Sequence, residues 1–425
     1  MALKEQFEIP GGLKKWSYAL MGVGVLTLIL GIIFLHPFSG GHGEAHGEEA
    51  YGATKFWMAL MHNSIYWLLV VAASFFFIAA TTLAQAGWPL VFRRVPEAIS
   101  GGLNVLGPVT LVILLAYVWI SDDHHIYHWK DAAHLDEKLQ AKSGFLNPTF
   151  YTVVSIVAVS LWIWFRNWFR KLSITEDQSV ERQTANYWRT LAVSAAFLVT
   201  YGLTVLSTLP WLWLMSIDAH WFSTMYSWYT FASSWVAGIS LIMLFVVYLK
   251  NHGYLEFVNE EHIHDIGKFM FAFSIFWTYL WFSQFMLIWY SNQPEETAYF
   301  IDRLGYGGKG DGPFRAMFLL NLIINFLAPL LILMRRGSKR SYTVVTLMSV
   351  ILIFGHWLDF YQMVTPGPLK ELGEDSNPIS HFVYSLGIAA GFLGLVIFLT
   401  ARYLTKASLL PKNHPLVKES IIHHT

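Results

Sequence analysis

The sequence predicts an all-α polytopic membrane protein with about ten transmembrane helices, and three observations support this. Of the 425 residues, 55% are hydrophobic and only 13% are charged, about half the charged fraction of a typical soluble domain. Apolar runs of about 20 residues, the length that crosses a bilayer, recur along the whole chain. Lys and Arg gather in every second connection between these runs, as expected for a chain that crosses the membrane repeatedly.

Ten candidate spans follow when the apolar runs are bounded by charged residues, Gly and Pro. In chain order they cover residues 16–35, 56–84, 101–120, 149–165, 187–206, 217–248, 267–290, 314–334, 342–364 and 379–404. The first is expected to be an uncleaved anchor helix, because its roughly 20 apolar residues end without an Ala-x-Ala-like cleavage site. Residues 1–15 and 405–425 are then an N-terminal segment and a C-terminal tail.

The positive charges orient these spans. Basic groups fall on one predicted side at Arg93 and Arg94, at Arg166 to Lys171, and at Arg335 to Arg340. The opposite connections are longer and acidic. By the positive-inside rule the basic side is cytoplasmic, and both termini lie on it.

A weak internal repeat divides the spans into two groups. The span that ends with Tyr117, Trp119 and Ser121 and the span that ends with Leu287, Trp289 and Ser291 each lead into a long acidic connection. They are four spans apart, so the repeat keeps its orientation in the membrane. We therefore expect one four-helix bundle over residues 56–206, a second over 217–364, and two extra helices, namely the anchor helix and the last helix at 379–404.

Composition excludes several functions. The sequence has no Cys, which removes disulfides, thiolate metal sites, iron–sulfur clusters and Cys-x-x-Cys-His haem attachment. An electron that passes through this protein must therefore leave through another protein. The formal net charge is zero, so no overall field attracts nucleic acid. No phosphate-binding Gly-rich motif or nucleophile elbow occurs, which argues against a nucleotide-driven pump or a hydrolase.

Ionisable residues inside the spans are the candidates for chemistry. A carboxylate at mid-bilayer costs about 2.5–3.5 kcal/mol even on insertion scales, so such residues are expected to serve a purpose. Six of them lie within about two turns of the outer ends of their spans: His62, Asp218, His220, His356, Asp359 and His381. We expect them to converge on one or two buried polar sites that face the outer side, with no metal bound.

Five residues are candidates for a proton pathway. His356 and Asp359 are three apart and project from one helix face, where a His beside a carboxylate can relay protons near neutral pH. Asp218 and His220 are two apart and cannot share a face of a regular helix. Gln284 could line a water path or join two helices. A lone His near a span end could equally be an interfacial side chain that reaches headgroup water.

Two segments carry a resemblance to a known family. Residues 216–227 read SIDAHWFSTMYS, and residues 267–297 read GKFMFAFSIFWTYLWFSQFMLIWYSNQPEET. They resemble the membrane subunits of alternative complex III, the bacterial quinol:cytochrome c (or cupredoxin) oxidoreductase. Those subunits are similar to the polysulfide reductase membrane-subunit (NrfD-like) family. The resemblance spans most of the chain and is to the shorter of the two such subunits.

The resemblance implies a ten-helix subunit of the bacterial inner (cytoplasmic) membrane, surrounded by the lipid bilayer. Its implied partners are a paralogous quinol-binding membrane subunit and periplasmic haem c and iron–sulfur subunits, with no nucleic acid. It would carry no covalently bound cofactor; menaquinol or another quinone is the implied ligand, and haem and iron–sulfur clusters are expected in partner subunits only. In NrfD-like proteins a His and an Asn on the first helix of the first bundle contact quinol, and His62 and Asn63 match that position.

Two other functions stay open on the sequence. The repeat and the polar residues between spans also suit a secondary transporter, which would purify as a small homo-oligomer without cysteine-containing partners. A structural scaffold subunit with no active site is the third possibility, and its bundle interior would be dry.

Overall fold

A computed structural model describes residues 6–38, 48–121, 123, 125–130, 135–178, 184–305, 312, 314–371 and 378–424. These residues form helices and connections and no strand. Ten helical segments among them are long and apolar enough to cross a membrane. The prediction of an all-α polytopic membrane protein is thereby confirmed.

Seven spans are single helices and three are interrupted. The single helices are α1 (Gly11–Leu35), α2 (Glu48–Leu83), α6 (Pro148–Gln178), α9 (Met225–Asn251), α10 (Glu260–Ser291), α15 (Tyr342–Val364) and α17 (Pro378–Leu404). The interrupted spans are α3 (Arg94–Ser100) with α4 (Leu103–Trp119); α7 (Thr184–Leu203), η3 (Thr204–Thr208) and α8 (Leu209–Trp213); and α12 (Arg315–Leu322), η5 (Ile323–Leu327) and α13 (Ala328–Leu333). Both η3 and η5 are π-helical turns, a local widening that often accompanies functional sites.

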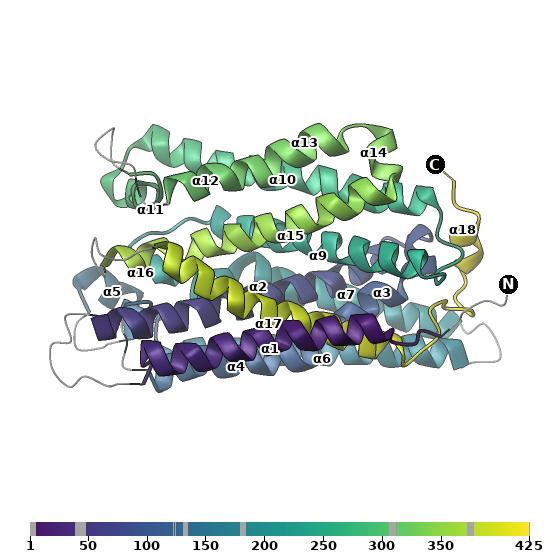
Figure 1. Cartoon of the computed structure of the whole chain (residues 1–425), viewed down its shortest axis with the longest axis horizontal. Coiled ribbons are helices and arrows are strands. Elements are labelled where there is room, and N and C mark those ends of the chain that lie inside the picture. The colour runs from purple at the N-terminus through teal and green to yellow at the C-terminus, as the bar shows by residue number, and fades with distance from the viewer. Residues whose placement is uncertain are drawn as a thin grey trace.

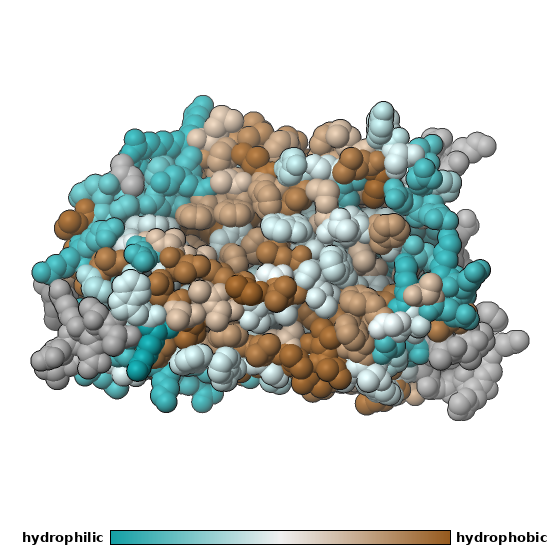
Figure 2. Space-filling model, turned by 180° about the vertical axis from the view of Figure 1, so that it is seen from behind, coloured by the Kyte–Doolittle hydropathy of each residue, from teal (hydrophilic) through white to brown (hydrophobic). Residues whose placement is uncertain are grey.

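Short helices connect the spans. They are η1 (Trp88–Phe92), η2 (His128–Lys130), α5 (Glu137–Lys142), η4 (Met215–Asp218), α11 (Pro294–Leu304), α14 (Arg336–Arg340), α16 (Pro366–Glu371) and α18 (Val417–Ile421). Helices α5, α11 and α16 lie at one end of the molecule, and α14, α18 and both termini lie at the other (Figure 1). These are termed the outer end and the inner end below. A predominantly apolar band separates hydrophilic ends (Figure 2), as a multi-pass membrane protein requires.

The helices pack as two groups joined at the centre. Helices α2, α4, α6 and α7 contact one another, as do α9, α10, α12–α13 and α15. Helices α2 and α9 pack together. In the most apolar 18-residue window of each, 78% and 89% of the residues are buried inside the protein, compared with 11–56% in the other spans. The polar residues of these two helices are thus held away from lipid.

Helices α1 and α17 form a separate antiparallel pair along one side of the molecule (Figure 1). Their backbones touch at Gly24 and Gly391, where a Cβ on Gly24 would lie 2.3 Å from the Gly391 Cα. Small residues allow this approach, as in other membrane helix pairs.

Several predicted boundaries differ from the structure by five or more residues, and two of these differences bear on the site. Helix α9 begins at Met225 rather than at residue 217, because the chain turns through η4 before it re-enters the membrane. Helix α6 continues to Gln178, well past the predicted end at 165, because its polar last turns pack at the inner end instead of ending at the edge of the apolar run.

Candidate functional site

A buried carboxylate, Asp359 of α15, is the centre of the second helix group. Its Oδ1 accepts hydrogen bonds from the Tyr229 hydroxyl of α9 and from the Asn321 Nδ2 of α12, the latter at 2.7 Å. Its Oδ2 accepts one from the Trp277 Nε1 of α10 at 2.8 Å. The side chain is fully buried. Each of the other three helices of the group thus supplies one donor.

All three donors to Asp359 are neutral. No ion pair to this carboxylate forms within the described part of the chain. Burial favours the protonated acid, whereas three donors to its oxygens favour the anion. Since these effects oppose each other and no fixed cation holds the charge, the site suits a group that changes its protonation state.

His356 lies one turn from Asp359 on the same face of α15, as the spacing predicts. It is fully buried, and its Nδ1 lies 3.0 Å from the Ser233 Oγ of α9. Its Nε2 is buried and has no partner among the described residues. The Trp277 ring meets the imidazole edge-on at 5.5 Å between centroids. His356 therefore adjoins the carboxylate with one ring nitrogen still available.

Two asparagines extend the polar contacts of Asp359 along the interrupted eighth span. The Asn325 Nδ2 donates to the Asn321 Oδ1 at 2.5 Å, while the Asn325 Oδ1 is buried without a partner in the described structure. A Cβ on Gly355 would lie 2.2 Å from that oxygen, so only glycine fits at this position of α15. Asn325 belongs to the π turn η5. The residues Tyr229, Trp277, Asn321, Asn325, His356 and Asp359 are termed the Asp359 cluster.

A small polar cavity adjoins the cluster on its outer side. Its volume is about 20 Å³, enough for one water molecule. Tyr229 and Asn321 of the cluster line it, together with Gln284 and Gln362. Both polar atoms of the Gln362 amide are buried and unpaired among the described residues. A water in this cavity would have the polar partners that ordered internal water needs. Gln284, a candidate to line a water path or to join two helices, is thus part of the wall of this cavity.

Arg303 of α11 closes the cavity toward the outer end. Its side chain is 1% exposed, and its guanidinium carbon lies 3.3 Å from the centroid of the Tyr299 ring. Nη1 donates to the Tyr299 carbonyl at 2.7 Å and Nε to the Gln362 carbonyl at 3.0 Å. Nη2 lies 3.5 Å from the Asp218 Oδ2. Burial disfavours the charge, but Tyr299 and Asp218 outweigh it, and the pKa of Arg303 lies above its ordinary value.

Asp218 joins this arrangement from η4, outside the membrane spans. Its side chain is 17% exposed, so the row of polar groups from Asp359 through the cavity and Arg303 reaches the outer surface. The sequence analysis included Asp218 and missed Arg303. The signal that the sequence offered for Arg303 was a single Arg in the amphipathic segment 294–304, on the predicted outer side, which carries few basic residues.

His220 does not join the cluster, and its predicted place inside the sixth span is wrong. Because α9 starts only at Met225, His220 lies in the connection, with a side chain that is 55% exposed. Its nearest charged partner is Asp136, at 3.5 Å, next to α5. It therefore belongs to the outer surface.

His62 and Asn63 of α2 form a second buried polar group, termed the His62 group, with Trp357 of α15 and Ser385 of α17. The His62 Nε2 lies 3.0 Å from the Trp357 carbonyl and must donate, while its Nδ1 lies 3.1 Å from the Ser385 Oγ. Asn63 donates to the Ser385 Oγ at 3.0 Å and accepts from the Trp357 Nε1 at 2.8 Å. The polar atoms of both candidate quinol contacts are thus already paired within the chain.

His381 lies beside the His62 group rather than in the Asp359 cluster. Its Nδ1 lies 3.0 Å from the Tyr361 hydroxyl, and the Tyr361 ring is 5.7 Å from that of His62. The ionisable residues of the spans therefore assemble into two separate sites, one between α2, α15 and α17 and one within the second helix group.

An ion cluster that the sequence analysis treated only as a topology signal lies at the inner end of the first helix group. Glu97 pairs with Arg94 at 2.7 Å and with Arg170 at 2.8 Å, and Arg94 also pairs with Asp177. Arg166 donates to the Glu97 carbonyl at 3.2 Å. These contacts join α3 to the inner end of α6.

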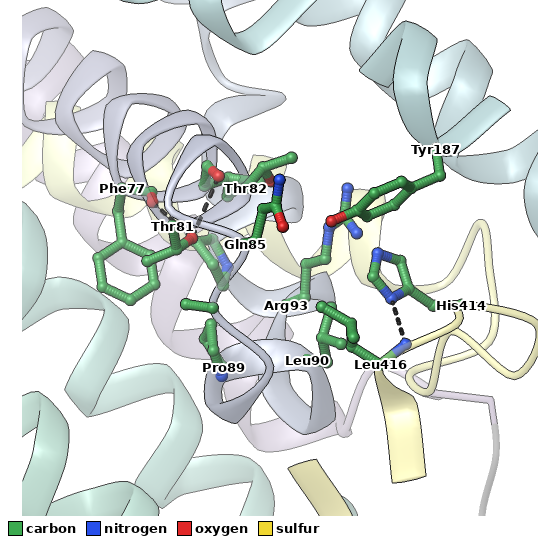
Figure 3. A pocket seen from close by; sticks show the side chains of 13 residues that line it. Phe77, Thr81, Thr82, Gln85, Pro89, Leu90, Arg93, Tyr187, His414 and Leu416 are labelled. Carbon is green, nitrogen blue, oxygen red and sulfur yellow. Dashed lines mark hydrogen bonds between the residues drawn. The ribbon is translucent and has the colours of Figure 1, made fainter. Parts of the chain in front are cut away.

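A cavity of about 10 Å³ lies beside this ion cluster, with Arg93, Tyr187 and His414 at its wall (Figure 3). Arg93 is buried, and its Nε and Nη2 have no partner among the described residues. Burial, together with Arg93 and Arg94, lowers the pKa of His414 to about 3. His414 is therefore neutral, and it packs the C-terminal segment against the turn before α3 and the start of α7.

Comparison with known proteins does not assign the chain to a family. No protein-family model matches the chain, and no curated protein sequence matches it. No group of three or more His, Asp and Glu side chains placed to hold a metal ion occurs among the described residues. The functional argument therefore rests on the geometry of the two polar sites.

Proposed function

We propose that the chain is an integral membrane subunit of a bacterial respiratory quinol:cytochrome c or cupredoxin oxidoreductase, of the alternative complex III type, and that it contributes a proton path through Asp359. The observation that supports the proton path is the environment of Asp359, a fully buried carboxylate that accepts three neutral hydrogen bonds and has no ion-pair partner among the described residues. The resemblance at residues 267–297 supports the type of complex.

The path runs from the Asp359 cluster to the outer end. A proton on Asp359 can pass by way of the Tyr229 hydroxyl to the cavity beside Gln362, which Asn321 also lines and which has room for one water. Arg303 and the partly exposed Asp218 lie beyond that cavity. Arg303 is a buried cation at the outer end of this path and would repel an excess proton that rests there. The proposal is therefore that protons pass one at a time and not through an open channel.

Quinol oxidation yields two electrons and two protons for each quinol. The electrons would pass to c-type haem and iron–sulfur groups of partner subunits, since this chain has no Cys to attach either of them. The His62 group offers a quinol ring no unpaired polar atom of His62 or Asn63. The proposal therefore assigns quinol binding to the paralogous partner subunit and proton movement to this one.

The test uses the purified complex in liposomes, with quinol:acceptor turnover and external proton release measured together. Asp359→Asn keeps the size of the side chain but removes the proton carrier. We expect turnover to fall by roughly 10²-fold, the scale of a lost proton-transfer group, with fewer protons released per electron. Glu295→Gln, an exposed carboxylate of α11, is the control and should match the unchanged protein.

Three outcomes would overturn the proposal. Unchanged turnover and proton release in Asp359→Asn would remove the proton path. Absence of quinol:acceptor activity from the purified complex would remove the assignment to this type of complex. Purification as a small homo-oligomer without cysteine-containing partners would favour a secondary transporter.

A further inference from the structure

A cavity of about 580 Å³ lies between α9, α15 and α17, and the proposed proton path does not use it. Side chains of these three helices line most of it, and Trp67 of α2 and Leu13 of α1 complete the wall. The volume falls within the roughly 300–1,000 Å³ of typical ligand sites. This groove could therefore hold a molecule of substantial size.

The shape of the groove follows from the directions of two helices. Helices α15 and α17 meet near their outer ends, where the rings of Trp357 and Phe382 are 5.5 Å apart. From there they diverge toward the inner end (Figure 1). The groove is thus closed at Trp357 and widens toward the inner side of the membrane.

The polarity of the lining changes along the groove. Its middle is built from aliphatic side chains such as Leu244, Val350 and Leu393, whereas Tyr248 and Asn251 line its inner mouth. A hydrocarbon chain fits the middle, and a polar group attached to that chain would lie at the inner membrane interface, where Tyr side chains are enriched.

Two exposed lysines lie in the first turns of α1, at the membrane depth of the inner mouth, and the Lys14 Nζ lies 5.9 Å from the centroid of the Tyr18 ring. Leu13 lines the groove, and the next two residues of α1 are Lys14 and Lys15, both exposed. The first turn of α1 contains no acidic residue. Lysines in this position attract anionic lipid headgroups, each by about 1 kcal/mol.

We propose that the groove holds an acyl chain of an anionic phospholipid from the inner leaflet, with the lipid phosphate at Lys14 and Lys15. A quinone is the rival occupant, because the indole N–H of Trp67 in the groove wall is buried without a partner among the described residues and could donate to a ring oxygen; the lysines near the inner mouth favour the anionic lipid. The indole N–H of Trp357, at the closed end, already donates to Asn63. The lipid chain fills the gap where α15 and α17 diverge, and it thereby ties the α1–α17 pair to the second helix group.

The test is photocrosslinking of the full chain in nanodiscs made from equal amounts of phosphatidylglycerol and phosphatidylcholine. Trace photoactivatable analogues of both lipids are included, and crosslinked peptides are mapped by mass spectrometry. We expect phosphatidylglycerol to label the groove-lining stretch from Leu386 to Ile397. The Lys14→Gln, Lys15→Gln variant should lose the preference for phosphatidylglycerol by about 30-fold, at about 1 kcal/mol for each lysine.

A second variant tests the groove itself. Ala390 lines the groove, and Ala390→Trp should lower labelling there at least tenfold by occupying the volume of the chain. The matched control is Ala196→Trp, on the exposed face of α7, which should leave labelling of the groove unchanged.

The proposal is overturned by equal labelling with both lipids in the unchanged protein, or by labelling that neither the lysine changes nor Ala390→Trp reduces. Recovery of a quinone in place of a phospholipid, displaced by Ala390→Trp, would overturn it as well. The exposed lysines lie outside the packed core, so that variant remains informative if Ala390→Trp does not fold.

Discussion

Replacement of Arg303 by Met tests how the outer end of the Asp359 path is held together. Met keeps an unbranched apolar stem in place of the buried arginine, whose side chain is 1% exposed, and removes the guanidinium. Two hydrogen bonds from a charged donor are lost, to the carbonyls of Tyr299 at 2.7 Å and Gln362 at 3.0 Å. Such bonds contribute about 1.5–3 kcal/mol each, before the desolvation of the charge is subtracted.

We expect Arg303→Met to lower the free energy of unfolding by about 3–5 kcal/mol, the range seen when one partner of a buried charged network is removed. Asp218→Asn should cost about 1 kcal/mol or less. Its oxygen is 3.5 Å from the guanidinium and its side chain is 17% exposed, so solvent weakens the attraction.

The assay is denaturant-induced unfolding of the purified protein in bicelles, followed by tryptophan fluorescence, for both single variants and the double variant. The coupling energy between the two positions should be below about 1 kcal/mol. Arg402→Met, at an exposed arginine of α17, is the control and should change stability little. A coupling energy as large as the whole Arg303→Met effect would refute the reasoning, because the ion pair with Asp218, and not the bond to the Gln362 carbonyl, would then hold α11.

Three further outcomes are expected. Because the pKa of His414 is lowered to about 3, the unfolded chain binds its proton first as pH falls below 6.5. This residue alone should lower stability by about 2 kcal/mol between pH 7 and 5, and His414→Gln but not His252→Gln should reduce the pH-dependent loss by that amount in thermal unfolding scans. Asn63→Leu leaves the Trp357 N–H unpaired and should cost about 1–3 kcal/mol in denaturant titrations; no loss would mean that this contact is dispensable. Glu97→Gln removes the shared partner of two arginines and should cost about 3–5 kcal/mol by the same titrations, whereas Glu295→Gln should be neutral.

The fold was predictable because each membrane span is visible in the sequence as a local run of about 20 apolar residues. Apolar run length located all ten spans, and the boundary errors arose where a helix extends beyond the apolar run at either end or starts late. Helix α6 extends to Gln178 because its last turns bury Arg166 and Glu176 at the inner end instead of ending at the lipid boundary. Helix α9 starts late because residues 215–218 form a separate turn.

The site was predictable only within a single helix. Residues three apart on α15 place His356 and Asp359 on one face, and the structure shows both in one cluster. Their partners Tyr229, Trp277 and Asn321 come from other helices, and no periodicity in the sequence reports which faces meet. His220 was misplaced because its depth was read from a span boundary that lies several residues away.

Arg303 is a second example of a residue whose contacts with another helix the sequence does not reveal. Its importance comes from burial against Tyr299, four residues earlier in α11, and beside Gln362 of α15. The second contact depends on how the short helix α11 folds back onto α15. The sequence offers only its charge and its position on the side that carries few basic residues. The same is true of Arg94, whose pairing with Asp177 of α6 emerges only from packing.

The most direct test of the central claim is infrared difference spectroscopy of the complex during quinol turnover, in H₂O and in D₂O. The account predicts a carbonyl band of a protonated carboxylic acid that appears or disappears with turnover, shifts in D₂O and is absent from Asp359→Asn. Difference spectra that are the same in the unchanged protein and in Asp359→Asn would contradict it, because Asp359 would then keep one protonation state throughout the reaction.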